Sequence, residues 1–266
     1  GALAITEPEA GSDVASIRTT ARRVEAGWVL NGTKMFITNG CRADFVIVVA
    51  RTGQVSGYQG LSLFIVDRET PGFAVGKKLA KVGMRSSDTA ELVFTDCLVP
   101  AESLLGQEGQ GFYHIMWELQ GERLFGGAMA AASALWMLEQ LWEHARACSR
   151  ANVEPWLGRL AESFAAALAC RELVYDTTRR ILRQEYPVTE VSAIKLLAGR
   201  VQWQAAELAL EFMSAHGCPA AWAERMWRDS RLTRIGGGTD EIMRNIIFRQ
   251  LREAVGAHGA AAGVSP

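Results

Sequence analysis

The sequence lacks the marks of a disulfide-stapled, membrane-spanning or nucleic-acid-binding protein. Only 5 of its 266 residues are cysteines, an odd number without a CxxC pair or a histidine at metal-ligand spacing. A disulfide framework and a metal site are therefore not expected, and a reducing cytoplasm is favoured. The longest nearly apolar stretch, residues 125–138, is too short to span a bilayer. The net charge of −1 gives no reason to expect nucleic acid or an anionic membrane as a partner.

The sequence also has no initiator methionine and no basic N-terminal region. Residues 1–5 are small and apolar, so we interpret them as part of a longer protein whose start is missing, and not as a signal peptide. Hydrophobic residues make up 49% of the chain and charged residues 21%, as in soluble globular proteins. A sizeable hydrophobic core is therefore expected.

Short β-branched and aromatic runs separated by turn residues predict an antiparallel, barrel-like β domain in the first part of the chain. These runs occupy residues 28–30, 35–38, 45–50, 61–66 and 91–95. Asn31-Gly32 lies between the first two runs and is a strong hairpin signal, because both central residues of a type I′ turn need positive φ. We therefore expect Trp28 and Phe36 on neighbouring strands.

The second part of the chain has the periodicity of a helix bundle. Apolar residues recur at helical spacing over 112–147, 156–182 and 191–213, and Pro155, Pro187 and Pro219 separate the stripes. A last helix is expected from Asp240 to about Arg252. The sequence thus predicts an α+β protein with a β domain over residues 1–108, a four-helix bundle over 109–255 and a disordered tail over 256–266.

Three segments have residue types that suit chemistry, although each has an ordinary structural interpretation. Residues 6–13 form a loop with hydroxyl and backbone donors, which is equally typical of a capped turn. Residues 236–239 resemble a phosphate-binding glycine loop but lack the Walker lysine. Glu122 borders an apolar helical stretch, and partial desolvation there would suit its carboxylate to act as a base, although most glutamates on helices are solvated.

Several sequence blocks in a fixed order are more specific than any one motif. They are Thr6–Asp13, Asn31–Gly40, Gly83–Thr89, Arg228–Arg231 and Ile235–Arg244. Together they resemble the signature blocks of the acyl-CoA dehydrogenase flavoproteins. The resemblance covers Gly1 to about Leu251 and corresponds to the middle β domain and the C-terminal helical domain of that family. The N-terminal helical domain of the family is absent from this chain.

The resemblance implies an FAD-dependent oxidoreductase. In this family a base removes the α-proton of a saturated acyl-CoA while the β-hydrogen passes to the flavin as hydride, and the product is a trans-2-enoyl-CoA. It also implies an electron-transfer flavoprotein as electron acceptor and assembly into a homotetramer or dimer. By position, the implied FAD contacts are Ile5, Thr6, Gly11, Ser12, Phe36, Thr38, Thr239 and Glu241. Ser12 and Arg123 are the implied substrate contacts.

The family places its catalytic base at one of two positions, and only one of them holds a proton acceptor here. The position before the Gly-Thr of the last block is Gly237, which has no side chain. The other position is Glu122, followed by Arg123, as in the isovaleryl and long-chain branches. The resemblance therefore implies that Glu122 is the base, and apolar neighbours would favour its protonated form.

Two segments depart from the family pattern. The Arg-x-x-Phe-Gly block that contacts FAD across the dimer interface is missing from residues 146–155, and the Gln-x-x-Gly-Gly block is reduced to Ser214–Cys218. These departures support an alternative in which the chain is a non-catalytic or half-site partner subunit with weakened FAD binding. A truncated chain without activity is a third possibility. His216 fits a packed helix end as well as a ligand, and no catalytic role is assigned to it.

Overall fold

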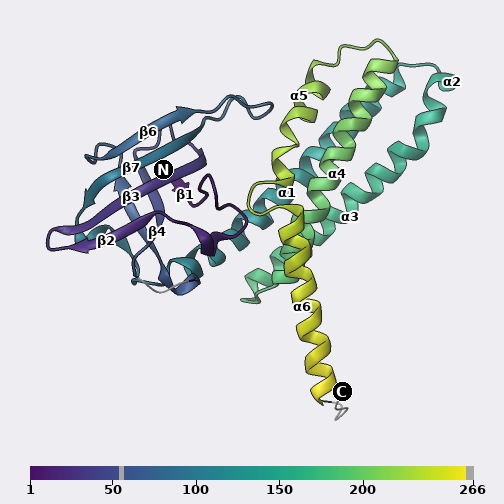
Figure 1. Ribbon diagram of the computed structural model, residues 1–266. Coiled ribbons are helices and arrows are strands. Elements are labelled where there is room, and N and C mark those ends of the chain that lie inside the picture. Colours follow the sequence, from purple (N-terminus) through teal and green to yellow (C-terminus); the bar gives the residue numbers. More distant parts are fainter. Residues whose placement is uncertain (54–56, 262–266) are drawn as a thin grey trace. The chain divides into compact units, whose positions relative to one another are not determined.

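The computed structural model describes residues 1–53 and 57–261, with the backbone alone from residue 255 onward (Figure 1). The chain divides into two compact units, Gly1–Glu118 and the part that begins at Leu119. Unit 1 contains the strands and unit 2 is helical, so the predicted α+β class is confirmed. The division between the units falls inside a helix and ten residues beyond the boundary predicted at residue 108. The limits of the predicted domains stay predictions.

Unit 1 is built on one sheet. Its strands are β1 (Ala2–Ala4), β2 (Thr20–Val24), β3 (Gly27–Thr38), β4 (Phe45–Arg51), β5 (Leu61–Asp67), β6 (Phe73–Lys78), β7 (Thr89–Val99) and β8 (Leu104–Leu105). Short 3-10 helices lie at Val14–Ser16, Tyr58–Gly60 and Ala101–Ser103. The strand order is β6-β7-β3-β2-β4-β5-β8, with β1 beside β4.

The sheet is mixed, although most of its ladders are antiparallel as predicted. β4 pairs in parallel with β1 and, at one position, with β2. The short connection after β3 reverses the chain, so β4 runs in the direction of β2, and the two can only meet in parallel. The sheet is open, with β6 and β8 at its two ends, and its buried side chains form a core in which the rings of Trp28 and Phe64 pack edge to face at 5.3 Å.

The hairpin predicted at Asn31-Gly32 is wrong. Both residues lie inside the continuous strand β3, so Trp28 and Phe36 share one strand, and the β2–β3 turn lies where Val24 pairs with Gly27. The Asn31 side chain instead exchanges two hydrogen bonds with Asp96 on β7, of 2.8 and 3.1 Å. A β-carbon on Gly32 would lie 2.4 Å from Thr19 Oγ1, so close packing accounts for this glycine.

Unit 2 is a bundle of helices. They are α1 (Gly111–Arg146, from Leu119 in this unit), α2 (Arg150–Val153), α3 (Leu157–Leu182), α4 (Val188–Ala215), α5 (Ala221–Asp229) and α6 (Asp240–Ala261), with 3-10 turns at Glu154–Trp156 and Leu232–Arg234. Pro155, Pro187 and Pro219 lie at or between helix ends, as predicted. The long helical stripes predicted from the sequence are therefore confirmed.

Helix α4 is the centre of this bundle. It packs against α3, α5 and α6 (Figure 1). Small buried residues on α1 and α4, such as Ala134, Ala205 and Ala209, share one core with Phe212 and Met213. Because alanine side chains are short, the helices that carry them can approach closely. Helix α5 was not predicted from the sequence, since its nine residues are fewer than a clear periodicity requires.

Helix α6 extends beyond the end predicted for it. It starts at Asp240 as expected but continues past Arg252 to Ala261, so the first part of the tail predicted to be disordered is helical. Alanine has the highest helix propensity of all residues, and the glycines of this segment do not end the helix. Residues 262–266 lie outside the described part of the chain.

Among the helices of the described residues, none combines the length and the apolar character that crossing a bilayer requires.

Candidate functional site

The loop that follows β1 is tied to β3 through its backbone. Met35 N donates to Thr6 O at 2.8 Å, and Lys34 Nζ donates to Ile5 O at 3.0 Å. Ile5 and Thr6 are half-buried, whereas Gly11 and Ser12 at the end of the loop are exposed. The predicted cofactor contacts of this loop thus lie on a segment fixed along β3.

A bulge near the end of β3 determines where Phe36 points. Lys34 pairs with Leu92 and Ile37 with Ala90 on β7, so two residues of β3 face a single residue of β7. Phe36 has φ of 62°, which is uncommon for an aromatic residue, and its side chain is 64% exposed. Bulges re-aim side chains in this way. Thr38, two residues further on, is also exposed.

The Gly83–Thr89 block packs beside the end of β3 through Asp88. The buried Asp88 carboxylate accepts hydrogen bonds from Cys41 N at 2.8 Å and Arg42 Nε at 2.7 Å, and Asp88 O accepts one from Asn39 N at 3.3 Å. Burial by itself raises the pKa of Asp88, but the bonds from Cys41 and Arg42 outweigh it and the pKa is lowered. Asp88 therefore joins its block to Asn39 through its backbone carbonyl and to the two residues after the Asn31–Gly40 block through its carboxylate.

In unit 2 the two alternative positions of the family base meet in space. The carboxyl carbon Glu122 Cδ lies 4.0 Å from the point that a β-carbon on Gly237 would occupy. Gly237 and Gly238 have φ of 65° and 104°, values that favour glycine, so the turn curls toward α1. The Glu122 side chain is exposed, and the next residue, Arg123, is 4% exposed and donates from Nε to Gly237 O at 2.9 Å.

A second cation holds the same turn from helix α4. Lys195 is 4% exposed, and its Nζ donates to Gly238 O. Burial lowers the pKa of Lys195 to about 8, opposed by the attraction of Asp240 and Glu122. Asp240 in turn accepts a hydrogen bond from Arg234 Nε at 2.8 Å. Arg123 on α1 and Lys195 on α4 therefore donate hydrogen bonds to the carbonyls of two successive residues, Gly237 and Gly238, beside Glu122.

Thr239 and Glu241 stand at the start of α6. Ile242 N donates to the Thr239 hydroxyl at 3.3 Å, as in a helix N-cap. The exposed Glu241 carboxylate accepts a hydrogen bond from Arg244 at 3.0 Å. Hydrogen bonds from its own backbone N–H, the Thr239 hydroxyl and Arg244 lower the pKa of Glu241, so the group is ionised at neutral pH.

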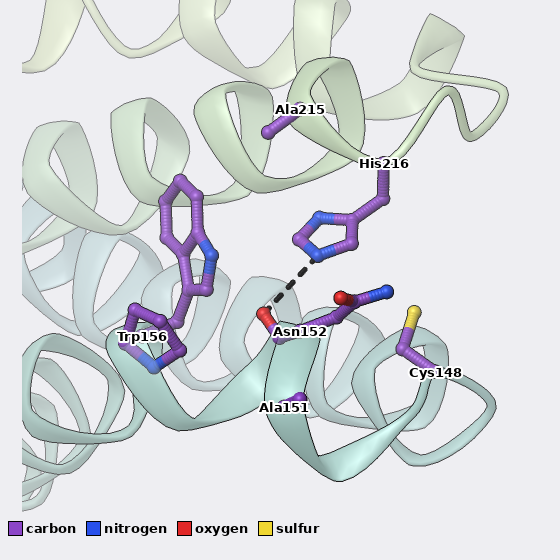
Figure 2. A pocket seen from close by; sticks show the side chains of 7 residues that line it. Cys148, Ala151, Asn152, Trp156, Ala215 and His216 are labelled. Carbon is purple, nitrogen blue, oxygen red and sulfur yellow. Dashed lines mark hydrogen bonds between the residues drawn. The ribbon is translucent and has the colours of Figure 1, made fainter.

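The two segments that depart from the family pattern lie against each other. His216 Nε2 lies 3.3 Å from Asn152 O, and a cavity of about 580 Å³ opens between the two segments (Figure 2). The His216 ring stacks on Phe212 at 4.1 Å, and the second ring nitrogen, Nδ1, lies 2.8 Å from Phe212 O. His216 therefore makes the contacts of a packed helix-end residue.

The structure brings the predicted residues together in two groups. Ile5, Thr6, Gly11, Ser12, Phe36 and Thr38 belong to unit 1, and Glu122, Arg123, Thr239 and Glu241 belong to unit 2. Sequence reasoning missed the buried Lys34, Glu7 and Lys195 that support both groups. Alternate residues of a strand face the core, and a lysine at one of these positions is the signal that could have identified Lys34. The hairpin wrongly predicted at Asn31-Gly32 divided the strand, so this alternation was not recognised.

Comparisons with known proteins identify the family. The model for the acyl-CoA dehydrogenase middle domain matches residues 2–97, and the C-terminal domain model matches residues 109–252, which is more than half of the chain. Mitochondrial isovaleryl-CoA dehydrogenase of Oryza sativa subsp. japonica is 36% identical over 261 residues, which is 94% of this chain and 63% of that protein. Mitochondrial long-chain specific acyl-CoA dehydrogenase of Rattus norvegicus is 38% identical over 266 residues, which is 94% of this chain and 60% of that protein.

A solved structure gives the same result. The crystal structure of acyl-CoA dehydrogenase from Geobacillus kaustophilus has a TM-score of 0.90 and 38% sequence identity, over 94% of this chain and 68% of that chain. The chain spans only 60–63% of the length of the two relatives from rat and rice. The resemblance predicted from the sequence blocks is confirmed, and the chain belongs to the acyl-CoA dehydrogenase family.

Proposed function

We propose that the chain acts in the FAD-dependent α,β-dehydrogenation of a saturated acyl-CoA to a trans-2-enoyl-CoA, with Glu122 as the base. One observation carries this proposal. Glu122 is the carboxylate beside Gly237, so the proton acceptor that Gly237 lacks is supplied from α1 at the same place. A carboxylate held beside the substrate can take the α-proton as the enolate develops.

The surroundings of Glu122 suit that role. Arg123 and Lys195 fix the Gly237–Gly238 turn beside Glu122, so the carboxylate stands next to a turn that two cations hold in place. Arg123 is buried and donates a hydrogen bond to the Gly237 carbonyl. This bond supports a structural role for Arg123 more directly than the predicted contact with substrate. Ser12, exposed at the end of its loop, is the second proposed substrate contact.

The residues of unit 1 fit FAD. Among the described residues, the hydroxyls of Thr6, Ser12 and Thr38 have no hydrogen-bond partner, so they remain available as donors to a polar flavin ring. Phe36 offers an exposed aromatic face, and Ile5 and Gly11 lie on the same loop as Thr6 and Ser12. When bound, FAD supplies a two-electron acceptor for the β-hydrogen.

The first turn of α6 supplies the proposed contacts with the FAD diphosphate. Helix N-termini present free N–H groups to anions, and Thr239 adds a hydroxyl there. The ionised side chain of Glu241 would repel a phosphate, but Arg244 engages it. The backbone N–H of Glu241 donates to its own carboxylate, so we propose that the contact at Glu241 forms when this N–H turns from the carboxylate to the phosphate.

The partners follow from the same proposal. An electron-transfer flavoprotein would reoxidise the flavin, and the chain would assemble into a homotetramer or dimer. The cysteines Cys41, Cys97, Cys148, Cys170 and Cys218 are free, which supports a reducing compartment such as the cytoplasm. Light scattering of the purified chain, alone and after addition of FAD, measures the assembly directly.

The second candidate, a partner subunit with weakened FAD binding, is favoured by the altered segments alone. Asn152 and His216 pack against each other and line a cavity where the family blocks are lost. Under this alternative the chain would bind a catalytic homologue, and its own flavin site would stay empty at any FAD concentration.

One experiment separates the two candidates. The visible absorption of the purified chain is recorded before and after addition of FAD, and then with saturated acyl-CoAs of several lengths. Bound oxidised flavin that bleaches with one acyl-CoA supports the dehydrogenase. The Glu122→Gln variant is the matched control, because it should bind FAD and fail to bleach. Failure of the wild-type chain to bind FAD would refute the dehydrogenase and support the partner subunit.

A further inference from the structure

A lysine and a glutamate form an ion pair in the interior of unit 1. Lys34 on β3 has no exposed surface, and Glu7 is 6% exposed. Lys34 Nζ lies 2.9 Å from Glu7 Oε1. Burial lowers the pKa of Lys34 to about 8, and the attraction of Glu7 opposes this, so both groups are charged at neutral pH. Buried charges are costly even when paired, so stability alone is a weak reason for this pair.

The Glu7 carboxylate also binds the chain that leads into β2. Its Oε2 accepts a hydrogen bond from Arg18 N at 2.6 Å, and its Oε1 accepts one from Thr19 N at 2.9 Å. The backbone of Glu7 exchanges two hydrogen bonds with Ala10, of 2.9 and 3.2 Å, which close the turn just before Gly11. One side chain thus fixes the loop, the start of β2 and the partner lysine.

The ion pair connects the two segments of unit 1 that we propose as flavin contacts, residues 5–12 and residues 36–38. Lys34 Nζ holds the Ile5 carbonyl at 3.0 Å, and the next residue, Met35, donates its N–H to Thr6 O at 2.8 Å. Met35 is followed directly by Phe36, where the bulge turns the ring outward. The position of Ile5 and Thr6 relative to Phe36 therefore depends on Lys34.

We propose that Lys34 and Glu7 are positioning residues for the flavin. Both side chains are buried, so both act through the segments that they hold. Lys34 places Ile5 and Thr6 beside the Phe36 bulge, and Glu7 places the turn that presents Gly11 and Ser12. This inference rests on the proposed binding of FAD. A purely structural ion pair would change the stability of unit 1 and leave the properties of the bound flavin unchanged.

The test compares neutral variants of the pair in the full chain. Glu7→Gln/Lys34→Met leaves no buried charge without a partner, so it should fold, with a thermal midpoint lowered by the loss of one acceptor for the N–H groups of Arg18 and Thr19. It loses the hydrogen bond to Ile5 O, so we expect the Kd for FAD to rise about tenfold and the visible bands of the bound flavin to shift. Glu9→Gln is the matched control, because Glu9 pairs with Arg18 at the surface of the same loop. It should leave both readouts unchanged.

The outcomes are distinct. A double variant with wild-type FAD affinity and wild-type flavin bands would overturn the positioning role, whatever its stability. If the double variant does not fold, Glu7→Gln/Lys34→Gln decides between the same outcomes, because it also leaves no buried charge without a partner and its shorter amide at position 34 loses the reach of Lys34 Nζ to Ile5 O. If the wild-type chain and Glu9→Gln bind no FAD, the proposed function itself fails and this inference fails with it. Loss of affinity in the pair variants alone supports it.

Discussion

The carboxyl carbon of Glu122 lies 4.0 Å from the place that a β-carbon on Gly237 would occupy. The two residues belong to α1 and to the turn before α6, and they meet because Arg123 and Lys195 hold the carbonyls of Gly237 and Gly238. A carboxylate on either residue would therefore start from nearly the same place.

The first prediction concerns the base itself. Glu122→Gln removes the proton acceptor but keeps the size of the side chain, so FAD binding and the thermal midpoint should stay unchanged. We expect turnover to fall by about 10²–10⁴-fold, the usual contribution of a general base. Stopped-flow bleaching of the flavin by an acyl-CoA measures this step. Ordinary activity in this variant would remove Glu122 from the mechanism.

The second prediction exchanges the two base positions. Glu122→Gly/Gly237→Glu should recover part of the activity that Glu122→Gly alone loses, because the new carboxylate starts beside the old one. Recovery should be incomplete, since φ of 65° at position 237 costs a non-glycine residue about 1–2 kcal/mol. The two variants are compared by kcat/KM on one substrate. Equal inactivity of both, with FAD bound, would contradict the shared position.

The third prediction tests whether FAD is bound in a functional way. Thr38→Ala removes an exposed hydroxyl at the end of β3, so FAD affinity should fall about fivefold to tenfold, the effect of one hydrogen bond. Equilibrium titration followed by absorbance measures the affinity. If neither Thr38→Ala nor Glu122→Gln changes any assay, the partner-subunit alternative gains support.

The fourth prediction follows from the pKa of Lys195, which burial lowers from 10.5 to about 8. Between these values the unfolded chain binds the proton that the folded chain has released, so the stability of unit 2 should rise as the pH increases through this window. The full effect is on the order of 3 kcal/mol, at 1.36 kcal/mol per pKa unit. Urea unfolding at about pH 7.5 and at about pH 10.5, the two edges of this window, measures the rise.

A matched pair of variants isolates the lysine. Lys195→Met should abolish most of the rise, whereas Lys77→Met, at an exposed position of β6, should leave it intact. An identical rise in wild type and Lys195→Met would show that another group is responsible.

Much of the fold was predictable because local patterns and tertiary packing agree. The stripe over 156–182 became α3 (157–182), since one apolar face suits both the helix and the core. Asn31-Gly32 failed because tertiary contacts overrode a local turn signal: Asn31 bonds to Asp96, and Gly32 makes room for Thr19.

Site residues could be predicted from the sequence only where they lie in, or align with, the sequence blocks of the family. Glu122 and Gly237 could be named from these blocks, but their proximity depends on how α1 packs beside the turn before α6. The supporting charges were not predicted, because a buried lysine such as Lys34 looks like any surface lysine until its strand register is known.

The fifth prediction concerns His216. The ring stacks on Phe212 at 4.1 Å and contacts Asn152 O at 3.3 Å, so His216→Ala should lower the stability of unit 2 by about 1–2 kcal/mol, the sum expected for one ring contact and one hydrogen bond. FAD affinity should not change, because His216 is a packing residue. Urea unfolding and FAD titration are measured on the same variant. Asn152→Ala is the control, since it keeps the backbone carbonyl that His216 contacts and should be nearly silent in stability. A loss of FAD affinity in His216→Ala with unchanged stability would show instead that the cavity between the two altered segments binds the cofactor.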